Sequence, residues 1–194
     1  MGTVKIPKPV QFFTSIIFSD EIVLFDAKER LRAAIGNFQE ETAFMLFSQT
    51  DYYEREMGNS LSRIFILFEP FFWRDMLPDI KLKTNDIELV LALKGKRVVN
   101  IDPGYISLEN IVLATTKGYA HRIYVGSGIY GDLTLTFSAG SYRPLGWTYP
   151  DYGSKEVISL LNRWRVLLKE KLKGHEVVEL RSFEYGKLGM KGQR

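Results

Sequence analysis

The order of strand-like and helix-like segments in residues 10–102 limits the fold more than any other feature of the sequence. Segment 10–18, VQFFTSIIF, is rich in aromatic and β-branched residues and too short for a helix, which predicts a buried strand. Further strands are expected at 41–48, 62–70 and 97–102, and helices at 20–35 and 78–95. Strand, helix, strand, strand, helix, strand is the split βαβ order, so we predict an α+β fold with a ferredoxin-like sheet.

The rest of the chain predicts smaller elements and one long helix. Asp102-Pro103-Gly104-Tyr105 has the composition of a type II turn, and Ser107 is expected to begin a short helix that ends near Thr116. Residues 121–137 predict a Gly-rich β-hairpin, and a short strand follows at 142–147. Residues 154–174 have apolar side chains at 3, 4 and 7 spacing, which predicts a C-terminal amphipathic helix.

Composition indicates one folded domain over residues 1–180. The chain has 194 residues, of which 45% are hydrophobic and 25% charged, as in globular proteins. Its net charge of +3 resides in residues 181–194, which we expect to be a flexible basic tail. There is no cysteine, so disulfides and thiol chemistry are excluded and a cytoplasmic location is expected. Apolar runs such as Leu89–Leu93 are far shorter than the roughly 20 residues of a membrane span, so no membrane partner is expected.

Two nucleotide-binding motifs are excluded. Gly126, Gly128 and Gly131 match GxGxxG, but the residues that follow are strand-like, whereas a dinucleotide fold needs a helix there. The glycines therefore predict a hairpin turn. No GxxxxGK[ST] sequence is present, so the chain has no P-loop.

Polar residues in segment 100–122 are the first candidates for a site. Asn100 and Asp102 share one face of the predicted strand and need partners or a ligand. Asp102 and His121 are the candidate acid–base residues. His121 is a candidate because an unperturbed histidine titrates near neutral pH. Arg122 is expected on the opposite face of a regular strand from His121, so the two are not expected to serve one site. The alternative is structural: a turn at Asp102 and a hydrogen-bonding histidine.

Two further segments contain candidate residues. Asp51 and Glu54 share a face if TDYYEREMG is helical, and their carboxylates suit a hard cation; a solvated acidic turn is the alternative. In WTYPDYG, Tyr149 and its aromatic neighbours either line a pocket or pack the final helix onto the sheet.

Several of these stretches together resemble one family. KPVQFFTSIIFSDE, TDYYEREMG, NIDPGYISLENIVLATTK, AHRIYVGSGIYGDLTL and WTYPDY are similar, in that order, to a prokaryotic domain of unknown function, DUF4416. The resemblance spans about residues 7–172 and implies no established activity. The resemblance implies where a site would lie, because its motif positions include Asp51, Tyr52, Glu54, Asn100, Asp102, Tyr105, Thr115, Lys117, His121, Arg122, Tyr149 and Asp151. Of these, Asn100, Tyr105, Thr115, Lys117, Arg122, Tyr149 and Asp151 are the predicted ligand-binding residues.

Three functions remain open from the sequence. The first is binding of a small phosphate-bearing or other anionic ligand, or of RNA, with Lys117 and Arg122 on anionic oxygens and Tyr105 or Tyr149 stacked on a ring. The second is a metal-assisted acid–base hydrolase. The third is an assembly module that uses the aromatic segment 69–77, EPFFWRDML. The sequence indicates no particular cofactor and no oligomeric state.

Overall fold

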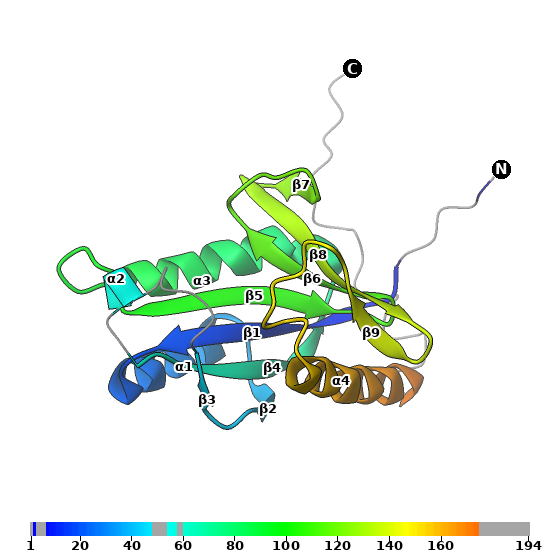
Figure 1. Ribbon diagram of the computed structural model, residues 1–194, viewed down its shortest axis with the longest axis horizontal. Helices are drawn as coiled ribbons and strands as arrows, with labels where there is room; N and C mark the ends of the chain where they lie inside the picture. The colour runs from blue at the N-terminus through cyan, green and yellow to red at the C-terminus, as the bar shows by residue number, and fades with distance from the viewer. Residues whose placement is uncertain (1, 3–6, 48–53, 58–59, 175–194) are drawn as a thin grey trace, which may run out of the picture.

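The structure is a computed structural model that describes residues 2, 7–47, 54–57 and 60–174. It is an α+β protein with a large antiparallel sheet and three long helices (Figure 1). The strands are β1 (Val10–Phe18), β2 (Phe38–Glu41), β3 (Met45–Leu46), β4 (Ser62–Phe72), β5 (Val99–Ile106), β6 (Asn110–Thr115), β7 (Arg122–Gly126), β8 (Ile129–Ser138) and β9 (Ser141–Pro144). The long helices are α1 (Glu21–Ala34), α3 (Leu77–Leu91) and α4 (Lys155–Gly174); α2 (Glu54–Met57) and the 3-10 turn η1 (Arg74–Met76) are short.

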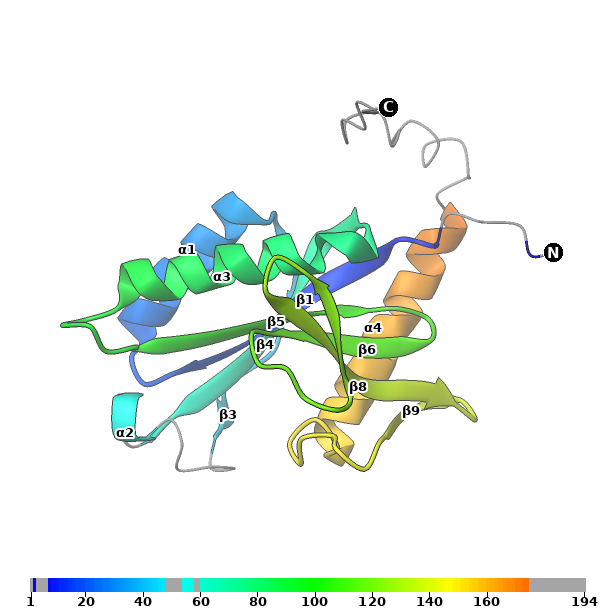
Figure 2. The same cartoon turned by 90° about the horizontal axis from the view of Figure 1, so that it is seen from above.

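The sheet runs in the order β2-β4-β1-β5-β6-β8-β7, with β3 paired to β4 and β9 paired to β8. Strand β1 is central and buried along its whole length. Its alternate side chains enter two cores: Phe12 and Ile16 pack with α1 and α3, and Phe13 packs with α4. Helices α1 and α3 lie side by side in Figure 2. Covering both faces explains why β1 is apolar without alternation.

The three long helices lie close to their predicted positions, which confirms the three predictions. Asp20 caps α1, because its carboxylate accepts the Ile22 N–H at 2.7 Å. In α3, Ile80, Thr84 and Ile87 are buried along one face. In α4, Ser154 accepts the Val157 N–H at 3.2 Å, and Trp164 packs against Phe13 with ring centroids 6.0 Å apart.

The strand predicted at 41–48 is displaced. Two shorter strands, β2 and β3, pair with β4 in its place. Between them, the Thr42 hydroxyl accepts the Phe65 N–H at 3.0 Å, a bond that a strand carbonyl makes in a continuous ladder. The side-chain bond marks the break in the strand.

The helix predicted from Ser107 to Thr116 is wrong, because this segment forms a turn and β6. The Ser107 hydroxyl accepts the N–H groups of Glu109 and Asn110, at 3.2 and 2.9 Å, as a helix cap would. Here these bonds close the tight connection from β5 to β6. The next four residues, 111–114, are all buried, so their unbroken apolar run belongs to a strand covered on both faces.

The type II turn predicted at Asp102-Pro103-Gly104-Tyr105 is also wrong, because these residues lie within β5. Gly104 is not among the glycines with positive φ and serves close packing: a Cβ there would lie 2.7 Å from both the Leu113 side chain and the Val112 carbonyl oxygen. Its role is to let β6 approach β5.

The Gly-rich hairpin is confirmed as β7 and β8, with positive φ at Gly126, Ser127 and Gly128, and β9 replaces the strand predicted at 142–147. None of the helices described by the structure is long and apolar enough to cross a membrane. The predicted tail, 181–194, lies outside the described residues.

Candidate functional site

A fork in the sheet creates the candidate site. Strands β5 and β6 pair from Ile106 to Gly104, and the ladder stops at Pro103. Proline has no N–H to donate, so it ends the ladder there. Strand β6 nevertheless continues along β8 as far as Thr115. The two strands therefore separate and leave a cavity of about 630 Å³.

Polar side chains from several elements line this cavity. The lining residues are Phe47, Arg63, Lys81, Asn85, Glu88, Arg97, Asn100, Asp102, Leu113, Ala114, Thr115, Thr116, Lys117, Arg122, Asp132, Tyr149, Pro150, Asp151 and Tyr152.

Helix α3 completes the open edge of β5. Lys81 Nζ donates to the Ile101 carbonyl oxygen at 3.2 Å, and Glu88 Oε1 accepts the Ile101 N–H. These two side chains supply the bonds that a neighbouring strand would make. Lys81 also lies 3.2 Å from Asp102 Oδ1, and its side chain is only 8% exposed. The open strand edge is thus satisfied by charged groups that face the cavity.

A chain of hydrogen bonds continues from Asp102. Asn100 Nδ2 donates to Asp102 Oδ2 at 2.6 Å, which confirms that both side chains share one face. Arg97 Nη1 donates to Asn100 Oδ1 at 2.8 Å, and Arg97 Nη2 pairs with Glu56 of α2 at 2.7 Å. The network ties α2 to the wall of the cavity.

Glu88 is the titratable group that this wall perturbs most. Burial raises its pKa from 4.5 to about 7; the nearby charge of Lys81 and the Ile101 N–H lower it in part, and Asp102 raises it. A carboxyl group with a pKa near neutrality is a candidate proton donor and acceptor.

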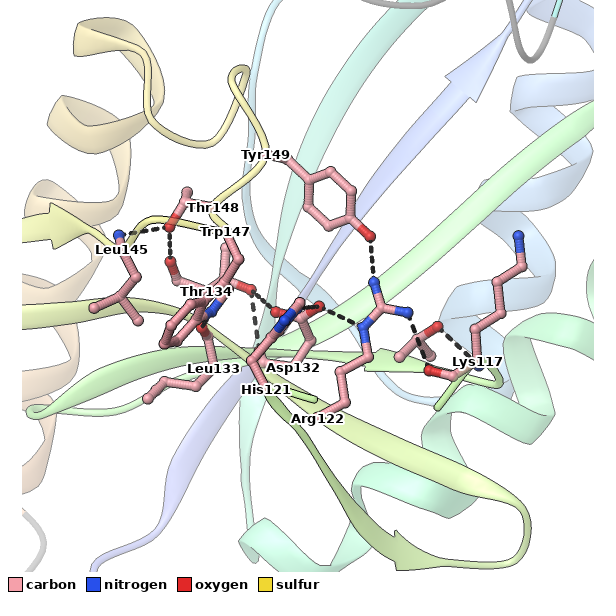
Figure 3. A network of polar contacts seen from close by, with 11 residues as sticks. Lys117, His121, Arg122, Asp132, Leu133, Thr134, Leu145, Trp147, Thr148 and Tyr149 are labelled. Carbon is pink, nitrogen blue, oxygen red and sulfur yellow. Dashed lines mark hydrogen bonds and ion pairs between the residues drawn. The ribbon is translucent and has the colours of Figure 1, made fainter. Parts of the chain in front are cut away.

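The opposite wall is organised by Asp132 of β8, whose side chain is 4% exposed (Figure 3). Arg122 Nε donates to Asp132 Oδ2 at 2.9 Å, and His121 Nε2 lies 3.3 Å from the same oxygen. The prediction that His121 and Arg122 serve different faces is wrong, because β7 begins at Arg122 and His121 belongs to the preceding turn.

Arg122 also fixes the loop that precedes α4. Its Nη2 donates to the Tyr149 hydroxyl at 2.7 Å, and its Nη1 donates to the Lys117 carbonyl oxygen at 3.0 Å. Trp147 stacks on His121 with ring centroids 5.0 Å apart and an interplanar angle of 14°. Burial raises the pKa of Tyr149, and the neighbouring Arg122 opposes this change. The loop is held over the cavity by these contacts.

Arg63 of β4 lies at the base, where its side chain is 8% exposed and pairs with Asp151. Its guanidinium carbon lies 4.5 Å from the Phe47 ring centroid and 5.7 Å from that of Tyr152. Arg63 Nε is buried and has no hydrogen-bond partner among the described residues. A buried donor of this kind is unusual and is one reason to regard the cavity as a binding site.

The fold gathers most of the predicted site residues. Those that line the cavity are Asn100, Asp102, Thr115, Lys117, Arg122, Tyr149 and Asp151. Among the described residues, His121 does not line the cavity but contacts Asp132, which does; Tyr105 instead packs against Phe12, with ring centroids 6.0 Å apart.

The predicted metal site at Asp51 and Glu54 stays a prediction. Asp51 lies outside the described residues, and Glu54 is the first residue of α2. Within the described part of the chain, no group of three His, Asp or Glu side chains is arranged to hold a metal ion.

Sequence reasoning missed several charged lining residues. Lys81, Asn85 and Glu88 lie at positions i, i+4 and i+7 of α3 and therefore form a polar stripe on one face of the helix. This spacing could have identified them from the sequence as residues that face a polar site. Arg63 and Asp132 are buried charges within largely apolar strands, and such charges require partners.

Comparison with known proteins gives a family and no characterised relative. No curated protein matches the chain, and no solved structure matches it. The model of one family, described as a domain of unknown function (DUF4416), matches residues 8–167, which includes every residue that lines the cavity. The chain therefore belongs to the DUF4416 family.

Proposed function

We propose that the protein binds a small phosphate-bearing or otherwise anionic ligand in the cavity between β5 and β6. The observation that carries this proposal is the convergence of five cationic side chains, from separate parts of the chain, on one space of about 630 Å³. Cavities of roughly 300–1,000 Å³ are typical of small-molecule sites. The five are Arg63, Lys81, Arg97, Lys117 and Arg122.

The carboxylates among them indicate a ligand with more than one kind of polar group. Asp102, Asp132 and Asp151 each pair with a lining cation and hold it in place. Cations fixed in this way are preorganised for an anionic oxygen, and carboxylate and amide oxygens suit hydroxyl or amine groups. A sugar phosphate or nucleotide has both kinds of group.

A small ligand fits better than RNA. The ion pairs at Arg63 and Arg122 are nearly buried, with side chains 8% and 12% exposed. Nucleic-acid surfaces use accessible cations along a groove, and stacking aromatic rings. Of the two tyrosines predicted to stack on a ring, Tyr105 is partly buried and packs against the core beside Phe12, which leaves only Tyr149 at the cavity.

Thermal unfolding with a ligand panel tests this proposal. Nucleotides, sugar phosphates and short RNAs are compared with the same sugars without phosphate. We expect a phosphate-bearing small molecule to raise Tm, and Lys117→Met to reduce the rise. Lys155→Met, an exposed lysine at the start of α4, is the matched control. The proposal fails if the whole panel leaves Tm unchanged, or if both lysine variants respond as the wild type does.

We also propose that part of the sheet forms a ferredoxin-like unit. The order β2-β4-β1-β5, with α1 and α3 in one layer, supports a ferredoxin-like unit to which β6–β9 and α4 are added. The fork, and thus the cavity, would lie where the added strands leave that unit. We further propose that residues 1–180 form a single domain. We propose a cytoplasmic location, which the lack of cysteine supports.

The two other functions stay predictions. A metal-assisted hydrolase depends on Asp51, which lies outside the described residues. An assembly module would use segment 69–77 to bind a partner. Phe71 and Phe72 are partly buried against opposite cores, which reduces the aromatic surface that this segment exposes to a partner.

A further inference from the structure

We infer that Glu88 binds the ligand's anionic group as a protonated carboxyl, so that the cavity takes up a proton together with its ligand. This inference rests on the proposed function and adds the residue and the protonation state that select the ligand.

The position of Glu88 supports this role. One oxygen, Oε1, is fixed by the Ile101 N–H, so the carboxyl group does not rotate freely. The other oxygen makes no hydrogen bond to any described residue, and Glu88 lines the cavity. A protonated carboxyl group has one O–H donor, and because Oε1 accepts the Ile101 N–H, the second oxygen is the one that carries this donor.

The charged groups around Glu88 come from three elements. Lys81 lies on the same helix, Asp102 on β5, and Arg97 on the connection between α3 and β5. Across the cavity lie Arg63, Lys117, Arg122, Asp132 and Asp151.

The two nearest cations already have acceptors. Lys81 bonds the Ile101 carbonyl oxygen and Asp102, and Arg97 bonds Glu56 and Asn100. An anion placed beside an ionised Glu88 would face repulsion at close range, which cations already paired with other acceptors offset only in part. Protonation removes the repulsion and adds a hydrogen bond.

The proton is available near neutral pH. Burial of Glu88 holds its pKa at about 7, so the protonated form is substantially populated before any ligand enters. A bound anion excludes water and adds negative charge, and both effects raise the pKa further. Proton uptake therefore requires little additional free energy.

Titration calorimetry with inorganic sulfate tests the inference, because sulfate does not titrate near neutral pH. Heats are measured in buffers of different ionisation enthalpy, and affinity is measured across the neutral range. For the wild type we expect uptake of up to one proton and affinity that weakens by about tenfold per pH unit once pH exceeds the pKa. Glu88→Gln should bind sulfate with pH-independent affinity, because its amide donates without titrating. Glu156→Gln, an exposed glutamate on α4, should behave as the wild type.

The outcomes separate the two proposals. Sulfate binding without proton uptake, or with the same pH dependence in Glu88→Gln, overturns the role of Glu88 and leaves the anion site standing. Failure of sulfate to bind at any pH tested, together with an unresponsive phosphate panel, removes the anion site and the inference with it.

Discussion

Arg122 and Asp132 face each other across the β7–β8 ladder, and Arg122 Nε donates to Asp132 Oδ2 at 2.9 Å. Both side chains are nearly buried, at 12% and 4% exposed, and His121 approaches the same carboxylate. This pair joins the hairpin to the wall of the cavity, and Arg122 extends the connection to Tyr149. Its removal should therefore affect both stability and the shape of the site.

Asp132→Asn should lower the free energy of unfolding by about 2–4 kcal/mol, because it leaves the buried Arg122 without a countercharge. Chemical denaturation measures the loss. The matched control is Asp26→Asn, which breaks an exposed pair with Arg30 and should cost less than about 0.5 kcal/mol. Equal effects of the two variants would show that the Asp132 pair is no better isolated from water than a surface pair.

Gly104→Ala should destabilise the protein by about 1–3 kcal/mol, because the added Cβ would lie 2.7 Å from the Val112 carbonyl oxygen and from the Leu113 side chain. Gly146→Ala is the control, since no atom lies within 4 Å of the Cβ position there. The comparison is made by thermal unfolding. If Gly104→Ala is as stable as Gly146→Ala, the strands are not as close at this point as the fork requires.

The stability of Glu88→Gln should differ from that of the wild type in its pH dependence. The pKa of Glu88 is 4.5 in the unfolded chain and about 7 in the folded protein. Between these values the folded state holds more protons, so the contribution of Glu88 to stability is fully present below pH 4.5 and is lost as pH rises through 7. Relative to the wild type, Glu88→Gln should gain up to about 3 kcal/mol across this range. Urea denaturation at several pH values measures the gain, and parallel pH profiles would contradict it.

Trp164→Ala tests the packing of α4 on the second face of the sheet. The side chain is fully buried against Phe13, so its removal should cost about 3–5 kcal/mol. Val166→Ala changes an exposed residue on the same helix and should be nearly neutral. Similar losses in denaturation midpoint for both variants would mean that α4 does not cover this face.

The sequence was most informative where burial is one-sided and periodic. Helices α1, α3 and α4 each have an apolar stripe and a recognisable start, such as Asp20 or Ser154, so their positions were predictable. It was least informative at Ser107, where capping bonds and an apolar run fit a helix and a β-turn followed by a buried strand equally well. Tertiary pairing with β5 and β8 decides between them.

The site residues that could be predicted were likewise those identified by a local pattern. Asn100 and Asp102 were identified because strand alternation is a local property. Lys81, Glu88 and Asp132 were missed because their role depends on the fork at Pro103, which brings together β5, α3 and β8. A proline in an Asp-Pro-Gly segment favours a turn by local rules, and only the neighbouring strands show that it ends a ladder instead.

Backbone amide chemical shifts, measured during titration with a phosphate-bearing ligand from the panel, test the central claim most directly. The account predicts that the largest changes fall on the two arms of the fork, at Ile101 and at Thr115–Lys117, while α4 residues such as Lys169 remain unaffected. Changes confined to surfaces away from the fork, with Ile101 and Lys117 unmoved at saturation, would contradict the claim that this cavity is the binding site.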